Sequence, residues 1–207
     1  MYILRILIAI SLAVSVISCL YYGYIKILYY AINLAAYYDI YFLYVKLGVK
    51  RGTAVGIFLF MIFFNNYLMQ IYNLNSYCVI KIVVITQTSD VYQFISGAYF
   101  GKNKIGWISK NKTYEGYIIG FIFTLITFMP LYYYKNGKSC FNTSIMEIFW
   151  IYFLGIISGL CSSLFKRIQN IKDYSNLLGP HGGWIDRIDS IILPSLFTAF
   201  PHVINLC

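Results

Sequence analysis

Long apolar runs separated by short polar stretches make up most of the 207-residue chain. Seven of these runs approach the roughly 20 residues that a helix needs to cross about 30 Å of hydrocarbon. They span residues 5–24, 27–47, 54–74, 78–100, 115–134, 144–165 and 187–206. The pattern predicts an all-α fold, a polytopic integral membrane helical bundle with about seven transmembrane helices.

The composition supports a membrane protein over a soluble domain, because 60% of the residues are hydrophobic and only 11% are charged. The first run follows Arg5 and lacks a small-residue cleavage motif, so we expect a retained helix and not a signal peptide. The net charge of +9 would suggest nucleic acid in a soluble protein, but no nucleic-acid motif is present. Five scattered cysteines without a CxxC pair indicate neither a zinc site nor a disulfide framework.

The positive charges predict an orientation. With a cytoplasmic N-terminus, twelve of the sixteen Lys and Arg residues lie on the cytoplasmic side, and the exceptions are Lys26, Lys81, Lys135 and Lys138. Both polar blocks of the sequence then face the cytoplasm. We therefore expect a multi-pass protein with a cytoplasmic active site, in the plasma membrane of a prokaryote or in the endoplasmic reticulum or an organelle membrane of a eukaryote.

Charge concentrates in residues 163–189, SLFKRIQNIKDYSNLLGPHGGWIDRID. If the chain is helical from Ile185, Asp186 and Asp189 lie three residues apart on one face, where two carboxylates can share a hard cation. The glycines of segment 178–183 allow backbone N–H groups to approach an anion. Cationic side chains, a glycine turn and paired carboxylates suit a metal-bound nucleoside triphosphate.

This stretch resembles the signature of the CDP-diacylglycerol synthase family, also called phosphatidate cytidylyltransferases. The positions that match are Ser163, Phe165, Lys166, Arg167, Lys172, Asp173, Ser175, Leu178, His181, Gly182, Gly183, Asp186, Arg187 and Asp189. Gly179-Pro180 replaces the family's Pro-Gly, and Trp184 replaces an aliphatic residue. Every charged position of the signature is retained.

A second polar block, residues 89–120, is similar to the same family. Asp90 is a carboxylate inside an apolar run, which indicates a functional site or a helix-pairing hydrogen bond. The positions that match are Asp90, Gly97, Phe100, Gly101, Ile108, Ser109, Lys112, Thr113, Glu115 and Gly116. Lys110 and Ile119 depart from the family's Pro and Gly. The two blocks together cover about 60 residues in the family's order.

The resemblance implies a phosphatidate cytidylyltransferase, a nucleotidyltransferase of phospholipid biosynthesis that converts CTP and phosphatidate to CDP-diacylglycerol and pyrophosphate. It implies Mg²⁺ as cofactor, with a second cation left open, and a homodimer in the lipid bilayer; no nucleic-acid partner is expected. We expect one transmembrane cytidylyltransferase domain, 1–207, in which 1–88 supplies N-terminal helices and 89–207 bears the motifs.

The resemblance also assigns roles to residues. The predicted catalytic residues are Asp186, Asp189, Asp173 and Lys172, and the predicted metal ligands are Asp173, Asp186 and Asp189. The predicted substrate-binding and nucleotide-binding residues are Ser163, Lys166, Arg167, His181, Gly182, Gly183, Arg187, Lys112, Thr113 and Asp90. Asp39, Glu147 and His202 match no motif, and we expect them at interfacial or packing positions.

Two other interpretations stay open. In a small membrane transporter or channel, Asp90, Asp186 and Asp189 would line an ion path, but such a path needs polar groups at several depths and here they gather toward one face. A catalytically weakened homologue is suggested by the altered turn residues and by a chain that is short for the family. The intact acidic residues argue against that alternative.

Overall fold

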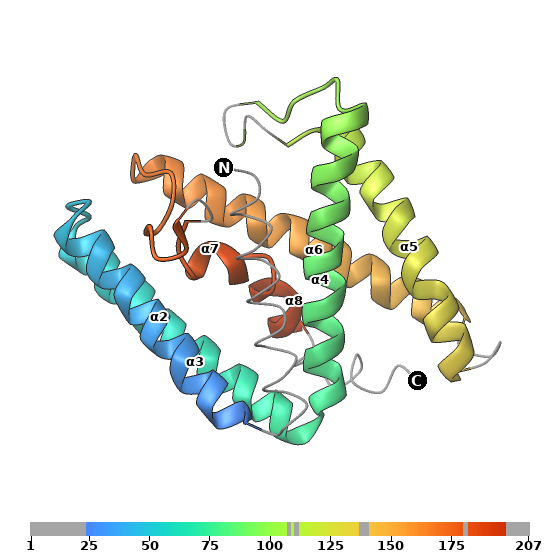
Figure 1. The fold of residues 1–207 in the computed structure, drawn as a ribbon, viewed down its shortest axis with the longest axis horizontal. Coiled ribbons are helices and arrows are strands. Elements are labelled where there is room, and N and C mark those ends of the chain that lie inside the picture. Colours follow the sequence, from blue (N-terminus) through green and yellow to red (C-terminus); the bar gives the residue numbers. More distant parts are fainter. Residues whose placement is uncertain (1–23, 107–108, 110–111, 137–140, 180–181, 198–207) are drawn as a thin grey trace. The chain divides into compact units, whose positions relative to one another are not determined.

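The computed structural model describes residues 24–106, 109, 112–136, 141–179 and 182–197. Within these ranges the chain is all-α, as predicted, and its only β-type pairing is an isolated bridge between Lys104 and Thr113. The helices (Figure 1) are α2 (Ile25–Val45), α3 (Arg51–Leu74), α4 (Ser76–Phe100), α5 (Tyr114–Asn136), α6 (Phe141–Ile168), α7 (Ile185–Ile188) and α8 (Ile192–Phe197).

Four of these helices, α3 to α6, are long and apolar enough to cross a membrane. Their candidate spans are Arg51–Asn73, Ser76–Phe100, Tyr114–Tyr132 and Thr143–Ile168. These spans and α2 coincide within a few residues with five of the predicted runs. The predicted first helix, 5–24, lies outside the described residues.

The predicted helix over 187–206 is wrong in its described part, because α7 ends at Ile188 and α8 begins at Ile192. Pro194 explains the break: its ring nitrogen cannot donate to the carbonyl of Ser190, and the ring would collide with that carbonyl in a continuous helix. In α8 the proline occupies the first turn, where no intrahelical N–H bond is needed. Ser158 of α6 binds the backbone at the break, donating to the Asp189 carbonyl and accepting from Leu193 N.

The described chain divides into two compact units. The first contains the described parts of Met1–Gln70 and Lys166–Ile188. In it α2 and α3 lie side by side (Figure 1), linked by hydrogen bonds from Tyr29 Oη to Asn66 Oδ1 (2.6 Å) and from Asn65 Nδ2 to Asn33 Oδ1 (3.0 Å). The hairpin core includes Phe64, which is fully buried.

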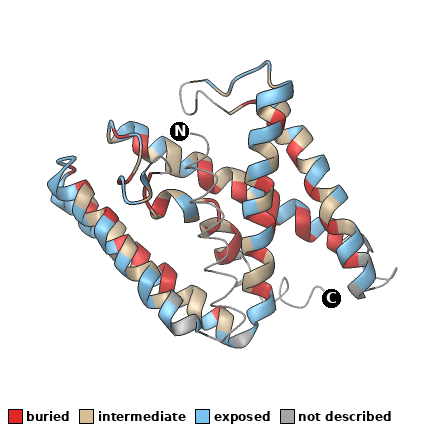
Figure 2. Cartoon of the chain, viewed as in Figure 1, coloured by how far each residue is buried: buried red, intermediate tan, exposed pale blue. Residues whose placement is uncertain are grey.

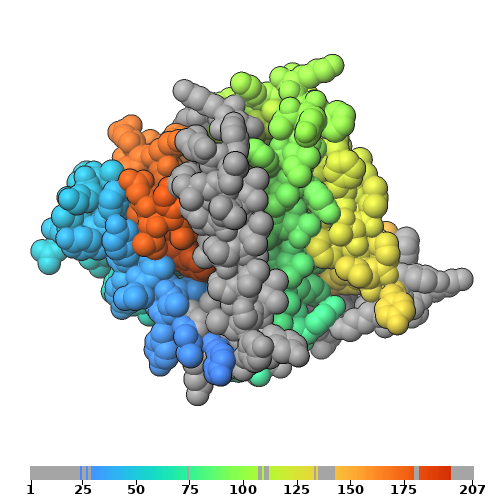
Figure 3. Space-filling view, viewed as in Figure 1, coloured from blue at the N-terminus to red at the C-terminus, as the bar shows by residue number. Residues whose placement is uncertain are grey.

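The second unit contains Ile71–Phe165 and the described part of Asp189–Cys207. Here α4 packs along α5 (Figure 3), and Tyr92 of α4 shares a 2.8 Å hydrogen bond with Thr127 of α5. Large apolar side chains remain exposed on both helices (Figure 2), including Phe94 of α4 and Ile118 of α5. Such exposure suits a lipid environment and would be unfavourable in water.

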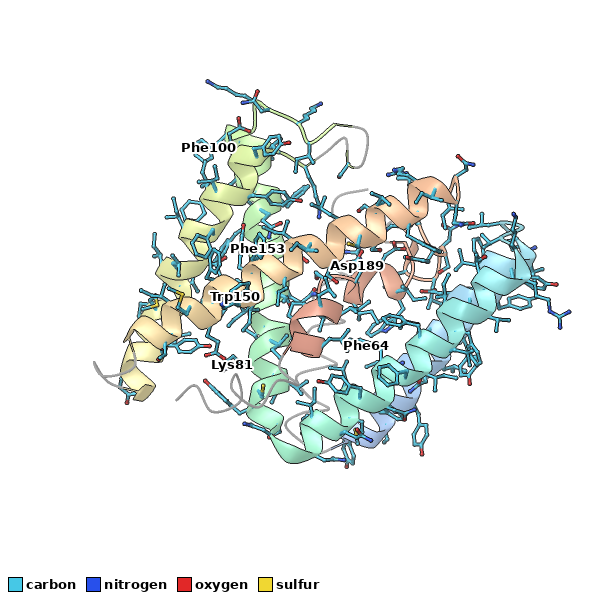
Figure 4. The ribbon with its side chains drawn as sticks, turned by 180° about the vertical axis from the view of Figure 1, so that it is seen from behind. Phe64, Lys81, Phe100, Trp150, Phe153 and Asp189 are labelled. Atoms are coloured by element: carbon cyan, nitrogen blue, oxygen red, sulfur yellow. The ribbon has the colours of Figure 1, made fainter. Side chains whose placement is uncertain are left out.

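A buried ion pair also lies in the second unit. Lys81 of α4, labelled in Figure 4, contacts Glu147 of α6, whose side chain is only 7% exposed. The Lys81 ammonium stands 5.6 Å from the ring centroid of Tyr77 and 5.7 Å from that of Tyr132. Because charges in apolar segments require partners, this pairing explains two of the chain's charges that belong to no motif.

Candidate active site

The signature begins at the end of α6, which extends through Lys166 and Arg167 in its last turn. Asn170 adopts a left-handed conformation (φ 56°), and Ile171 N donates to the Lys166 carbonyl at 2.9 Å. This is a common helix-terminating arrangement, and the helix dipole favours cations at this end. The local sequence therefore ends α6 and turns the chain into the signature loop, defined here as residues 166–188.

Lys166 and Asp186 form a buried ion pair within this loop. Lys166 is 8% exposed, and its Nζ donates to Asp186 Oδ1 at 2.6 Å. The ammonium also stands 5.2 Å from the centroid of the Tyr174 ring. A lysine that only anchored a helix end to lipid headgroups would be exposed, so the geometry favours a role for Lys166 inside the site.

The second oxygen of Asp186 binds two segments of the signature loop, which we call its arms. One arm carries Asp173 and Tyr174, and the other carries Gly183 and Asp186. Tyr174 N and Gly183 N each donate to Oδ2 at 2.9 Å. One carboxylate therefore receives a lysine ammonium and two backbone N–H groups. Charge-assisted hydrogen bonds of this kind are stronger than neutral ones, and they fix the loop around Asp186.

Asp173 approaches the same carboxylate across Gly182. A Cβ at residue 182 would lie 2.9 Å from Asp186 Oδ2 and 3.3 Å from Asp173 Cγ, so both carboxyl groups closely flank the glycine. Gly182 also has a φ of 79°, which side chains disfavour. The sequence prediction that Gly182 belongs to the site thus has a steric reason.

This pair of carboxylates fits a magnesium ion, which commonly binds one or two carboxylates and completes its coordination with water and substrate phosphates. Among the described residues, no group of three or more His, Cys, Asp or Glu side chains is arranged to hold a metal. The predicted three-carboxylate set of Asp173, Asp186 and Asp189 stays a prediction. His181 lies outside the described residues.

Three cationic side chains of the loop are exposed: Arg167, Lys172 and Arg187. Arg167 holds its own loop through a 3.3 Å hydrogen bond from Nη1 to the Ile171 carbonyl. The loop therefore combines a buried, paired lysine with exposed cations, and only the exposed ones are accessible to a ligand's phosphates without rearrangement.

The second polar block forms a tight turn between α4 and α5. Thr113 Oγ1 accepts a hydrogen bond from Gly116 N at 3.1 Å and caps the start of α5. The Glu115 carboxylate accepts from Lys102 N at 3.2 Å and from Asn103 N at 3.1 Å. These contacts show that Thr113 and Glu115 shape the turn, whatever else they bind.

Three glycines pack around Thr113. A Cβ at Gly101 would lie 2.3 Å from the Gly97 carbonyl oxygen and 2.6 Å from Thr113 Oγ1, and one at Gly116 would lie 2.9 Å from that same hydroxyl. No side chain fits at such distances. The spacing of glycines in this block is therefore required by the close approach of α4 and α5.

We expect Gly101→Ala to lower stability by about 1–3 kcal/mol, the usual range for overpacking, because the new methyl group would meet backbone at Gly97. Thermal unfolding of the purified protein in detergent measures the effect. Gly56→Ala in α3 is the control: nothing lies within 4 Å of its Cβ, and alanine favours a helix by up to about 1 kcal/mol. Equal stability of Gly101→Ala and the wild type would contradict this packing.

Lys112 and Ser163 both approach Gly159 of α6 in the second unit. Lys112 Nζ lies 3.3 Å from the position of a Cβ on Gly159 and 5.8 Å from the Tyr117 ring centroid. Ser163 Oγ donates to the Gly159 carbonyl at 2.8 Å. Asp90 is half-buried in α4.

The predicted site residues that the structure describes thus fall into two groups, one in each unit. The first unit holds Lys166, Arg167, Lys172, Asp173, Gly182, Gly183, Asp186 and Arg187. The second holds Asp90, Lys112, Thr113, Ser163 and Asp189. Asp189, labelled in Figure 4, follows α7 directly, and its backbone carbonyl accepts from Ser158.

One residue of the site was missed by sequence reasoning. Asp39 of α2 is fully buried, and its carboxylate binds the signature loop. A single aspartate in an apolar run is unusual, and this could have marked Asp39 as a functional residue. However, no motif in the sequence connected it to the signature loop.

Comparison with known proteins agrees with the signature. A family model described as the cytidylyltransferase family matches residues 2–204. A phosphatidate cytidylyltransferase of Rickettsia bellii is 36% identical over 144 residues, covering 64% of this chain and 57% of the relative. One of Aquifex aeolicus is 30% identical over 128 residues, covering 61% and 47%. The chloroplastic phosphatidate cytidylyltransferase 4 of Arabidopsis thaliana is 32% identical over 104 residues, covering 50% and 27%.

In the part of the chain that the structure describes, an all-α fold with four candidate membrane spans and a charged glycine loop is typical of a helical membrane protein with a polar site. This chain belongs to the cytidylyltransferase family, because the family model covers nearly its whole length. The chain spans about half the length, or less, of the curated relatives named above.

Proposed function

We propose that the chain transfers the cytidylyl group of CTP to phosphatidate, forming CDP-diacylglycerol and pyrophosphate. The observation that carries this proposal is the signature loop, in which Asp173 and the Lys166–Asp186 pair lie close together and Arg167, Lys172 and Arg187 are exposed. The names of the relatives, phosphatidate cytidylyltransferases, support the same activity.

In the proposed reaction, a phosphate oxygen of phosphatidate attacks the α-phosphorus of CTP. A new P–O bond forms, the bond between the α-phosphorus and its bridging oxygen breaks, and pyrophosphate leaves with that electron pair. Both reactants are anions that repel each other, so the protein must supply positive charge at both. The exposed cations Arg167, Lys172 and Arg187 would hold the phosphates, with the arginines suited to bidentate contacts.

Asp173 and Asp186 would hold Mg²⁺, with Asp189 as a further ligand. The ion would supply charge stabilisation at the triphosphate. Lys166, paired with Asp186, orients that carboxylate before substrate arrives. Because the attacking phosphate is already anionic, no general base is needed, and we assign His181 to the turn or to a phosphate contact and not to proton transfer.

We propose that the second polar block also binds nucleotide. Lys112 carries a charge suited to a phosphate, and Asp90, Thr113 and Ser163 offer polar groups for the nucleotide. Gly182 and Gly183 would admit the ligand close to backbone N–H groups. We further propose a cytoplasmic active site, a single catalytic domain over 1–207, and a homodimer.

The direct test is transfer of label from CTP, carrying ³²P at its α-phosphorus, into chloroform-soluble product by the purified 207-residue protein. We expect label only when CTP, phosphatidate and Mg²⁺ are all present. Diacylglycerol, which lacks the attacking phosphate, should give none. An absence of labelled lipid from folded protein would contradict the proposal and favour a weakened homologue, and Mg²⁺-independent labelling would contradict the metal assignment.

A further inference from the structure

The Asp39 carboxylate is buried at a point where α2 meets the signature loop within the first unit. The residue is 0% exposed, and both of its oxygens accept hydrogen bonds from that loop. Ser175 Oγ donates to Oδ1 at 2.5 Å, and Ile185 N donates to Oδ2 at 2.8 Å. One side chain thus binds two loop positions that are ten residues apart.

Gly183 allows this approach. A Cβ on residue 183 would lie 2.6 Å from Asp39 Oδ2, closer than any side chain tolerates. The Gly183 N–H meanwhile donates to Asp186 at 2.9 Å. The backbone of segment 183–185 is therefore held by two different carboxylates, because Gly183 N donates to Asp186 and Ile185 N donates to Asp39.

The two bonds of Asp39 lie next to the proposed metal carboxylates. Ser175 is two residues after Asp173, and Ile185 immediately precedes Asp186. Ser175 Oγ also accepts from Leu177 N at 3.0 Å, which fixes the hydroxyl in the loop. Asp39 therefore bridges the two arms that carry Asp173 and Asp186.

Burying a carboxylate in an apolar helix costs free energy, because the charged group loses its hydration. An aliphatic side chain at the same position would be buried without this cost. Its advantage is that it accepts two hydrogen bonds from separate arms. We propose that Asp39 is a positioning residue that sets the separation of Asp173 and Asp186 and so the affinity of the loop for a divalent cation. This inference rests on the proposed function for its catalytic consequence.

The test compares Asp39→Ala with Asp39→Asn by Mn²⁺ titration, with bound ion measured by electron paramagnetic resonance in purified protein. Asparagine retains an acceptor for Ile185 N, and Ser175 can rotate its hydroxyl to accept from the amide. We expect Asp39→Ala to weaken Mn²⁺ binding by about tenfold, the lower end for residues that orient metal ligands. Asp39→Asn should restore most of the affinity.

A parallel activity assay uses the Mg²⁺ concentration that gives half-maximal rate. Misplaced carboxylates raise this concentration, whereas partial unfolding only lowers the maximal rate. Glu147→Gln is the matched control, because Glu147 is also a buried carboxylate but pairs with Lys81 instead of the loop. It should reduce stability and leave the Mg²⁺ dependence unchanged.

The outcomes separate the two proposals. Unaltered Mn²⁺ binding in folded Asp39→Ala protein would overturn the positioning role, even if the wild type makes product. Wild-type protein that binds Mn²⁺ but makes no lipid product would overturn the proposed function and leave the positioning role standing.

Discussion

Asp186→Asn is expected to lower turnover by about 100- to 1,000-fold, the range seen when a group that stabilises developing charge is removed. The same substitution should destabilise the protein by about 3–5 kcal/mol, because it breaks a buried ion pair and leaves Lys166 without its carboxylate. The asparagine oxygen can still accept from Tyr174 N and Gly183 N, but its amide then faces the lysine ammonium. Two donors would oppose each other in a buried space.

The double variant Lys166→Met/Asp186→Asn separates folding from function. Removing both charges together should recover most of the lost stability, since replacement of a buried pair by apolar groups is often neutral. Turnover should remain as low as in Asp186→Asn. Thermal unfolding and the labelled-lipid assay on the same preparations check both expectations, and recovery of turnover along with stability would show that Asp186 is only structural.

Asp189→Asn is expected to reduce turnover by a similar factor of about 100- to 1,000-fold while the protein stays folded. The hydrogen bond from Ser158 to residue 189 uses the backbone carbonyl, which asparagine retains. Loss of activity in folded protein would therefore report on the Asp189 carboxylate and not on this backbone contact. Lipid product per mole of folded protein is the quantity to measure.

Ser158→Ala is the matched control for Asp189→Asn. It removes the hydroxyl that binds the Asp189 carbonyl and Leu193 N but leaves the carboxylate in place. We expect a loss of stability of about 1 kcal/mol, typical of a hydrogen bond, and a smaller effect on turnover than that of Asp189→Asn. Normal turnover in Asp189→Asn would contradict the metal assignment of this residue.

Much of the fold follows from the apolar runs. The runs of 54–74, 78–100, 115–134 and 144–165 lie within α3 to α6, because only a helix satisfies its backbone inside an apolar run of that length. The break after Ile188 was not predicted, because the many apolar residues of the run 187–206 suggested one continuous helix. Pro194 marks this break, and Ser158 of α6 binds the backbone on both sides of it, a contact that no local sequence pattern indicates.

The candidate site was predictable where its residues lie close together in the sequence. The order and spacing of Lys166, Asp173 and Asp186 carried the resemblance, and the structure gathers their side chains around the loop. Asp39 was not predictable, because it is 136 residues from Ser175 and no local spacing links the two. Gly183 shows the same limit. Its sequence position suggested a turn, but glycine is required there because the Asp39 carboxylate leaves no room for a Cβ.

The central claim is that one cytidylyl group moves to phosphatidate for each pyrophosphate released. Parallel reactions with CTP labelled at the α-phosphorus or at the γ-phosphorus test it most directly. We predict that lipid gains the α label and that pyrophosphate gains the γ label in equal molar amounts, only with phosphatidate and Mg²⁺ present. Release of the γ label without labelled lipid, or no reaction in folded protein, would contradict this account.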